Sequence, residues 1–526
     1  MGIKPYGKSR LKSDHNSLAG VAINEMTERN QSLAWRVTVG VFLCLALWPL
    51  WSVRFPPMQD YPEHLFHAHM LSVHNDPAFD YNRYYESRIR PVYASFFLTT
   101  LFFAKFLPIE IAGKLSLSLY PILVTILVVR LGSRLGREVV PWGALLFFPL
   151  MFNQLYFLGT VNFFLSLPIL ILTLLDYEDF LGGTLSAWAI VRHSLWQVAL
   201  FITHPFSFLA YVSMATVCAI LTRRVTGNWG SKLMASMGVT LPLLVLSWVE
   251  IKATPSSEVS EGLGWGWFSP QITMGFFALM FNGMRQLRVV DSVSLILWGV
   301  VFAVVLGVLL VDWRKSGAVS LSKMHLVFLV LGIVGLFILP FRIGTFTYIN
   351  VRVATIIYFL IALLAARVRF RGWLACCLLI GLLGLCMIDS IAKQARISAE
   401  VNEILPIVHR IPPNSRILPL VFDHGSPELD KSWFDPHLHD HDYYHVLVGG
   451  GFSPYIFGTD MRYKMGEERP APGEYQPGRF SWEDYSADYQ YFLIRGMPDG
   501  LDEYMSKTCD KLCVSGSWTL FERKLE

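Results

Sequence analysis

Long apolar runs separated by short polar stretches fill most of the chain up to about residue 390. A bilayer core needs about 20 helical residues, and these runs are continuous rather than alternating, so each predicts a membrane helix. The pattern indicates a polytopic α-helical membrane protein of about 11 transmembrane helices. The expected spans are 33–53, 115–129, 139–152, 156–175, 191–203, 206–221, 232–248, 289–311, 324–339, 353–366 and 373–391.

Two apolar segments fit better as helices that lie on the membrane surface, near 91–107 and 271–283. If 91–107 crossed the bilayer, the next span would end outside with Arg130, Arg134 and Arg137. Basic residues favour the cytoplasmic side, so an interfacial helix removes this conflict. The basic tail 1–32 likewise predicts a cytoplasmic N-terminus.

The last part of the chain differs in kind, being rich in Pro, Gly, Asp, His and Tyr. It contains short runs with the composition of β-strands. These runs are Arg416–Phe422, Tyr443–Val448, Tyr489–Arg495 and Ser517–Arg523. We therefore expect a small extracytoplasmic α/β domain over 393–526, after a transmembrane domain over 33–392 whose first outer loop is 54–114.

Composition supports this division: 53% of residues are hydrophobic, 16% are charged and the mean hydropathy is +0.43. The net charge of +4 comes from clusters between apolar runs, which indicates topology rather than nucleic-acid binding. The expected location is the inner (plasma) membrane. Cys509 and Cys513 lie in the polar C-terminal part, where a disulfide or two free thiols are both open.

The first outer loop carries the best candidate for chemistry. Its sequence Met58-Gln59-Asp60-Tyr61-Pro62-Glu63-His64 follows the first span directly. Burial at a cavity mouth would raise the pKa of Asp60 and suit it to general-base catalysis, with Glu63 one helical turn on. His64 is a candidate substrate contact. A divalent metal held by His64 and His67 with Asp60 or Glu63 is an alternative that we do not favour, and a solvated connector is another.

Four further polar residues are candidates for substrate binding. Arg342 and Arg352 flank a short loop that is expected outside, although basic residues favour the cytoplasmic side. Binding of a lipid phosphate would explain their position. The alternative is that their side chains snorkel to lipid headgroups. His204 ends a span before a proline, as a substrate contact or a helix-end residue. Asn162, inside an apolar run, is expected to bond across helices or to line a cavity.

Other motifs leave two interpretations each. Trp265 and Trp267, set between glycines, suit a sugar-stacking platform or an interfacial anchor. The histidines at 437, 439 and 441 would share one face of an extended strand and could bind a metal, or they belong to a surface loop. Three glycines at 449–451 predict a tight turn or a close backbone approach.

The arrangement of a short tail, one span, an outer loop with an early acidic residue and a soluble domain after the last span resembles the bacterial GT-C superfamily of membrane glycosyltransferases. The interfacial helix before the span that ends at Arg130 fits the same layout. The resemblance implies a polyprenyl-phosphate-linked sugar donor and an inverting transfer on the outer face. It maps the family's acidic residue onto Asp60 and its phosphate-binding arginine onto Arg342 or Arg352.

The paired Asp-Glu of some members is absent, because Tyr61 follows Asp60. A mechanism without metal or other cofactor is therefore expected. The expected partners are a polyprenyl-phosphate-linked sugar, membrane lipid and a glycan, lipid or protein acceptor, with no nucleic acid. Two other hypotheses stay open: a transporter or flippase of a lipid-linked glycan, and a non-catalytic envelope scaffold.

Overall fold

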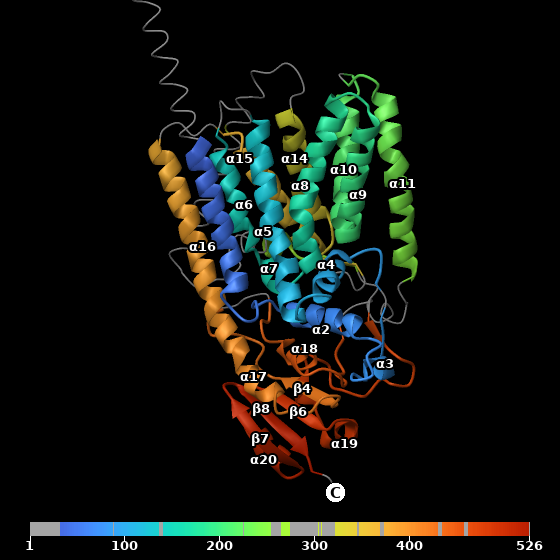
Figure 1. The fold of residues 1–526 in the computed structure, drawn as a ribbon, viewed down its shortest axis with the longest axis vertical. Coiled ribbons are helices and arrows are strands. Elements are labelled where there is room, and N and C mark those ends of the chain that lie inside the picture. Colours follow the sequence, from blue (N-terminus) through green and yellow to red (C-terminus); the bar gives the residue numbers. More distant parts are fainter. Residues whose placement is uncertain are drawn as a thin grey trace, which may run out of the picture.

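A bundle of apolar helices stands on a smaller mixed domain in the computed structural model (Figure 1). The structure describes residues 32–87, 89–135, 140–224, 226–253, 265–273, 303, 307, 321–343, 347–368, 373–429, 434–456 and 461–524. The expected span 289–311 and most of the expected surface helix at 271–283 lie outside these residues. Below, the end of the bundle beside the mixed domain is called the domain end.

Eleven helical segments make up the described bundle. Six are long and apolar enough to cross a membrane: Ser32–Trp51, α5 Ile109–Arg134, α8 Val161–Gly182, α10 Pro205–Thr222, α11 Trp229–Ala253 and the segment that contains α16 Trp373–Val401. Four are shorter: α4 Ser95–Ala104, the broken segment Trp142–Leu158, α14 Leu321–Ile338 in its apolar part, and α15 Ile349–Ala365. The helix α9 Ala187–Thr203 packs on α8. The predicted polytopic helical class is confirmed.

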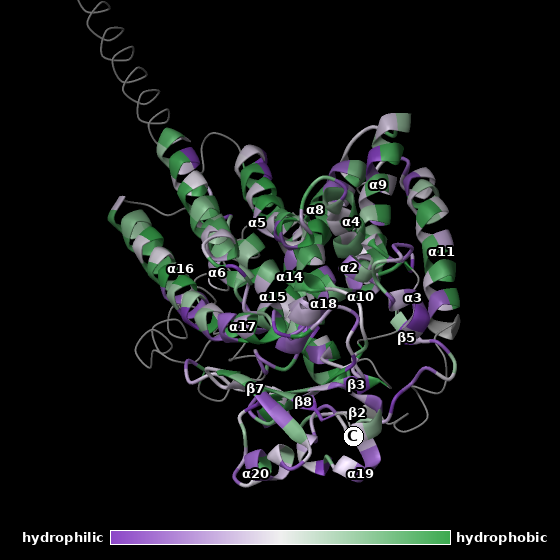
Figure 2. Cartoon of the chain, turned by 60° about the horizontal axis from the view of Figure 1, so that its bottom comes forward, coloured by the Kyte–Doolittle hydropathy of each residue, from purple (hydrophilic) through white to green (hydrophobic). Residues whose placement is uncertain are grey.

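The helix α8 forms the centre of the bundle, between α5, α9 and α10. Its apolar residues occur all around the helix, which is typical of a fully buried segment. Its most apolar stretch is entirely buried inside the protein, whereas only 17% of the corresponding stretch of α11 is buried. Figure 2 shows apolar residues predominating over the bundle helices and a mixture of polar and apolar residues over the domain below.

The expected surface helix at 91–107 is present as α4, and its ten residues rise only about 15 Å, too little to cross a bilayer core of about 30 Å. The expected span 139–152 is instead a 3-10 turn, η1 Trp142–Leu146, followed by α6 Phe147–Met151 and α7 Gln154–Leu158. Pro141 before the turn and Pro149 inside α6 prevent one continuous helix.

The mixed domain contains a four-stranded sheet of order β4-β6-β8-β7. The strands are β4 Ile417–Val421, β6 Tyr491–Arg495, β7 Cys509–Ser515 and β8 Trp518–Arg523, with β4 and β6 parallel and the other pairs antiparallel. Three of the predicted strands are confirmed. The fourth is wrong, because Tyr443–Leu447 is the short helix α18. Cys509 and Cys513 are free thiols, four positions apart along one strand.

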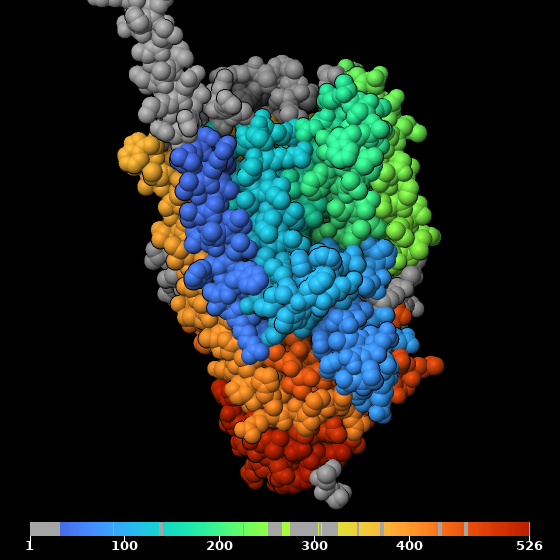
Figure 3. Space-filling view, in the orientation of Figure 1, coloured from blue at the N-terminus to red at the C-terminus, as the bar shows by residue number. Residues whose placement is uncertain are grey.

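The first loop and the mixed domain pack into one body around α2 Tyr61–Ser72 (Figures 1 and 3). One side of α2 packs on α4 and α5, and the other on α18 and the 3-10 turn η4 Asp440–Asp442. Phe66 of α2 stacks on His445 with ring centroids 4.1 Å apart. A two-stranded ribbon, β1 Tyr85–Ser87 with β5 Met461–Tyr463, joins the same two parts. The helix α16 continues past residue 392 to Val401.

The glycines at 449–451 confirm the expected close approach. All three have positive φ, and a Cβ on Gly449 would lie 2.2 Å from the ring of Phe79 in the first loop. The backbone N–H of Gly451 donates to the carboxylate of Asp80 at 2.6 Å. A side chain at Gly449 would push Phe79 and the first loop away from the domain, whereas side chains at Gly450 and Gly451 would meet Asn414 and Ser415 of the domain itself.

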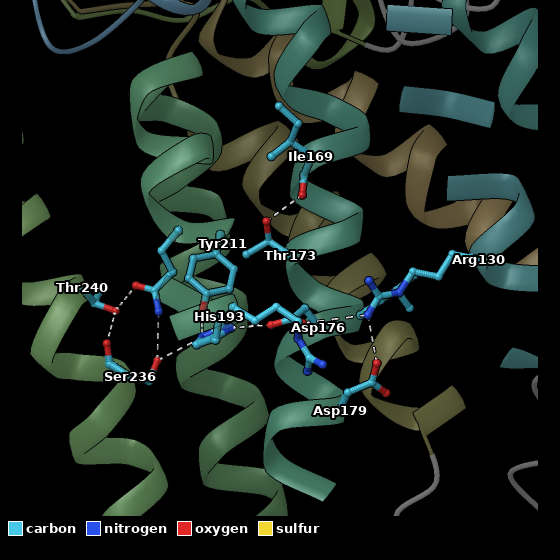
Figure 4. A network of polar contacts seen from close by, with 12 residues as sticks. Arg130, Ile169, Thr173, Asp176, Asp179, His193, Tyr211, Ser236 and Thr240 are labelled. Carbon is cyan, nitrogen blue, oxygen red and sulfur yellow. Dashed lines mark hydrogen bonds and ion pairs between the residues drawn. The ribbon is translucent and has the colours of Figure 1, made fainter. Parts of the chain in front are cut away.

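A buried network of charged residues lies at the end of α8 far from the mixed domain (Figure 4). Asp176 is fully buried and contacts Arg192 Nε at 2.6 Å and His193 Nδ1 at 3.0 Å. Nearby, Glu178 contacts Arg134 at 3.2 Å and His325 at 2.7 Å. These acids lie between the expected spans 156–175 and 191–203. In the structure they belong to the last turns of α8 and pair with α5, α9 and α14.

Candidate functional site

Asp60 lies at the start of α2, where the chain turns from the first membrane helix into the domain end. The backbone N–H groups of Gln59 and Asp60 donate to the carbonyls of Phe157 and Leu158, at 2.9 and 3.2 Å. Gly159 follows with φ of +86°, and a Cβ there would lie 2.7 Å from Asp60 N. Glycine is therefore required at position 159 for two reasons: the positive φ and the closeness of the Asp60 backbone.

Asp60 and Glu63 form a buried acidic pair that shares a histidine from the mixed domain. Their exposed fractions are 5% and 4%. His439 places Nδ1 at 3.5 Å from Asp60 Oδ1 and 3.8 Å from Glu63 Oε2. Its other nitrogen, Nε2, lies 3.2 Å from Glu474 Oε1. The site is thus completed by two side chains that lie far from Asp60 in the sequence.

Burial controls the protonation of this cluster. It raises the pKa of Asp60 to about 7, against the lowering effect of His439, and raises the pKa of Glu63 well above its ordinary value. Burial alone would lower the pKa of His439, but Glu474, Glu63 and Asp60 together raise it well above the ordinary value. A carboxyl group with a pKa near 7 is matched to general-base work at neutral pH.

Tyr348 lies near both the acidic pair and Arg352. It precedes α15 with φ of +61°, which is rare for a non-glycine residue. Burial raises the pKa of Tyr348, the charge of Asp60 raises it further and the charge of Arg352 lowers it. Both charged groups are therefore close enough to act on the same phenol, which places the candidate base and the candidate phosphate ligand in one region.

Arg352 lies among aromatic rings with part of its guanidinium unused. Its Nη1 donates to the carbonyl of Thr347 at 2.8 Å, and its Cζ is 5.7 Å from the ring centroid of Phe163. Its Nε is buried and makes no hydrogen bond with the described residues. His204 is buried against the rings of Phe163 and Tyr93, at 5.1 and 4.9 Å, and its Nδ1 likewise makes none there.

Asn162 orders the backbone beside this pair. Its Oδ1 accepts hydrogen bonds from Ser95 Oγ at 2.8 Å and from the N–H of Phe96 at 3.0 Å. Its amide donates to the carbonyl of Tyr93 at 2.7 Å, where the backbone φ is +59°. The amide thus fixes the start of α4 and the ring that packs on His204.

The remaining candidates lie apart from the acidic pair or face another way. Arg342 is exposed on β3 Arg342–Ile343, which pairs with β2 Trp265–Gly266. Trp267 donates from Nε1 to the carbonyl of Ile338 at 3.0 Å, and 53% of its surface is exposed. This arrangement favours Arg352 over Arg342 as the phosphate ligand.

His64 and His67 turn toward α4. The ring of Phe97 lies 5.9 Å from His64 and 4.6 Å from His67, and burial lowers the pKa of His64 to about 3. His67 Nε2 is 2.8 Å from Ser87 Oγ. In the part of the chain that the structure describes, no three His, Cys, Asp or Glu side chains are placed to hold a metal ion together.

The histidine run 437–445 is neither an extended strand nor a surface loop. It passes through a turn and η4 into α18, and its side chains are buried. His437, His439 and His441 do not share one face, because each has its own set of partners. The sequence signalled an unusual density of histidine, but nothing in it linked His439 to Asp60. No sequence pattern identified Glu474 as a site residue.

No family model matches the chain, and no curated protein matches it by sequence. Solved structures do match. The crystal structure of ArnT from Cupriavidus metallidurans bound to undecaprenyl phosphate covers 92% of this chain and 97% of its own, with a TM-score of 0.56 and 10% identity. The chain has the ArnT fold. The apo structure of the same protein gives a TM-score of 0.55 and 11% identity, over 93% of this chain and 98% of its own.

The match extends over nearly the whole length, which confirms the expected order of a helical membrane bundle followed by a smaller domain. It covers both the helical bundle and the domain after it. At this level of identity the likeness concerns the fold, so the chemistry must be argued from this chain's own side chains.

Proposed function

We propose that this protein is an integral-membrane glycosyltransferase that takes sugar from a polyprenyl-phosphate-linked donor. The single observation that carries the proposal is that buried Asp60 and Arg352, whose Nε makes no hydrogen bond with the described residues, both lie close enough to Tyr348 to influence its phenol. The ArnT structure that matches this fold was solved with undecaprenyl phosphate, which supports a lipid of this kind as the donor carrier.

The proposed reaction is a single displacement. An acceptor hydroxyl gives its proton to Asp60, and its oxygen forms a bond to the anomeric carbon of the donor sugar. The bond between that carbon and the phosphate oxygen breaks, and the lipid phosphate leaves with the electron pair. Arg352 stabilises the negative charge on the phosphate, and the configuration of the sugar inverts. His439 keeps Asp60 ionised for a larger fraction of the time, since its positive charge lowers the pKa of that carboxyl.

The proposed topology puts the N-terminus in the cytoplasm and the domain end outside. The basic clusters predicted this orientation. It brings the site to the leaflet where a polyprenyl-linked sugar would meet an envelope acceptor, which is a glycan, a lipid or a protein.

Binding of undecaprenyl phosphate to the purified protein tests the donor assignment. We expect Arg352→Ala to weaken binding by about tenfold to a hundredfold, because a charge-assisted bond to phosphate is worth about 1.5–3 kcal/mol. Arg342→Ala is the matched control, an exposed arginine that precedes the same helix. Equal affinity of the wild type and Arg352→Ala would remove Arg352 from the donor site.

A further inference from the structure

A second buried histidine, His437, lies two residues before His439 and bridges two carboxylates. Its Nδ1 is 2.7 Å from Asp440 Oδ2, and its Nε2 is 3.0 Å from Glu400 Oε2. The His437 side chain is fully buried. A neutral imidazole carries one N–H and can donate to one carboxylate only, so two such contacts require the imidazolium form.

The two carboxylates belong to different parts of the fold. Glu400 is in the last turn of α16, the long helix that runs from the membrane bundle into the mixed domain (Figure 1). Its other oxygen accepts a hydrogen bond from Ser426 Oγ at 2.9 Å, which fixes its orientation. Asp440 begins η4, directly after His439. The bridge therefore connects α16 to the segment 437–440.

The surroundings favour the charged form of His437. Burial alone would lower the pKa of His437, but Asp440 and Glu400 together raise it above the ordinary value, against the opposing charge of Arg495 on β6. Arg495 itself is paired with Asp423 at 3.4 Å. These are the charged groups that face the ring from α16, η4 and β6.

We propose that His437 is a positioning residue for the site described above. As an imidazolium it fastens the segment 437–440 to α16 and so holds His439 beside Asp60. Loss of its proton breaks one of the two contacts, releases this segment and lets His439 withdraw. The inference rests on the proposed transferase function. It predicts that loss of the His437 proton limits the transfer rate at alkaline pH, whereas protonation of Asp60 limits the rate at acid pH.

The test compares wild type with Glu400→Gln over the pH range of the transfer reaction, using full-length protein in vesicles with a polyprenyl-phosphate-linked sugar. With one carboxylate gone, His437 loses its proton at lower pH. We expect the alkaline limb of the rate profile to move down by about one pH unit or more, with the acid limb unchanged. Asp440→Asn should move the same limb in the same direction, and provides a second variant if the first folds poorly.

Glu428→Gln is the matched control. Glu428 also links the domain to α16, through Arg396 at 2.5 Å, but that pair is exposed and does not involve the bridge. Its pH profile should equal that of wild type. If Glu400→Gln lowers the rate by the same factor at every pH, its role is structural only and the proposal is wrong.

A measurement without substrate separates this inference from the proposed function. A raised folded-state pKa stabilises the protein fully below the unfolded pKa of about 6.5, and this stabilisation is lost as the pH rises through the folded value. The gap in Tm between wild type and Glu400→Gln should thus shrink by roughly half or more from pH 6 to pH 9. A constant gap would overturn the bridge, whereas absent transfer with a shrinking gap would overturn only the transferase.

Discussion

His439 Nδ1 lies 3.5 Å from Asp60 Oδ1, so the mixed domain supplies a charged partner to a carboxyl of the first loop. Without the mixed domain, Asp60 and Glu63 would lack the positive charge of His439. The domain is therefore part of the candidate site.

Replacing His439 should change how Asp60 titrates. In His439→Gln the positive charge is gone, so the pKa of Asp60 should rise by about one to three units, and the acid limb of the transfer rate should move upward with it. His409→Gln, an exposed histidine of the same domain, is the control. An acid limb that stays in place would show that the 3.5 Å contact does not govern the base.

Gly159→Ala should disturb Asp60 without touching any charge. The new methyl group would meet the backbone of Asp60 at 2.7 Å and force a non-glycine residue to φ of +86°, which together should destabilise the protein by about 1–3 kcal/mol. Transfer should also fall. Gly182→Ala, at the other end of α8 where nothing lies within 4 Å, should do neither. Thermal unfolding in detergent and the transfer assay measure both effects.

Asp176→Ala should weaken the bundle far from the site. It leaves Arg192 without its buried counter-charge and His193 without its carboxylate partner, and the expected loss of stability is about 3–5 kcal/mol. Asp179→Ala, whose side chain is 39% exposed, should cost about 1 kcal/mol or less. Unfolding measurements on the two variants decide the matter; equal losses would mean that burial of Asp176 adds nothing.

The sequence predicted what depends on local pattern. Apolar length located the long helices, and β-branched and aromatic runs located β4, β6 and β8. The same reasoning failed at Tyr443–Leu447, because five residues are too few to distinguish a strand from a helical turn by periodicity.

Asp60 could be singled out because it follows the first span directly, and Arg352 because its charge opposed the bias of its side of the membrane. His439 and Glu474 could not be linked to Asp60, since only the folded chain brings them together. The buried acids at the end of α8 were also out of reach: their arginine and histidine partners come from three other helices.

The rate of sugar transfer by Asp60→Asn tests the central claim most directly. Full-length wild type and variant are placed in vesicles with a radiolabelled polyprenyl-phosphate-linked sugar, and binding of undecaprenyl phosphate is measured alongside. The account predicts that Asp60→Asn binds the lipid like wild type but transfers about 10²–10⁴-fold more slowly, as expected when a general base is lost. Transfer at the wild-type rate would contradict it.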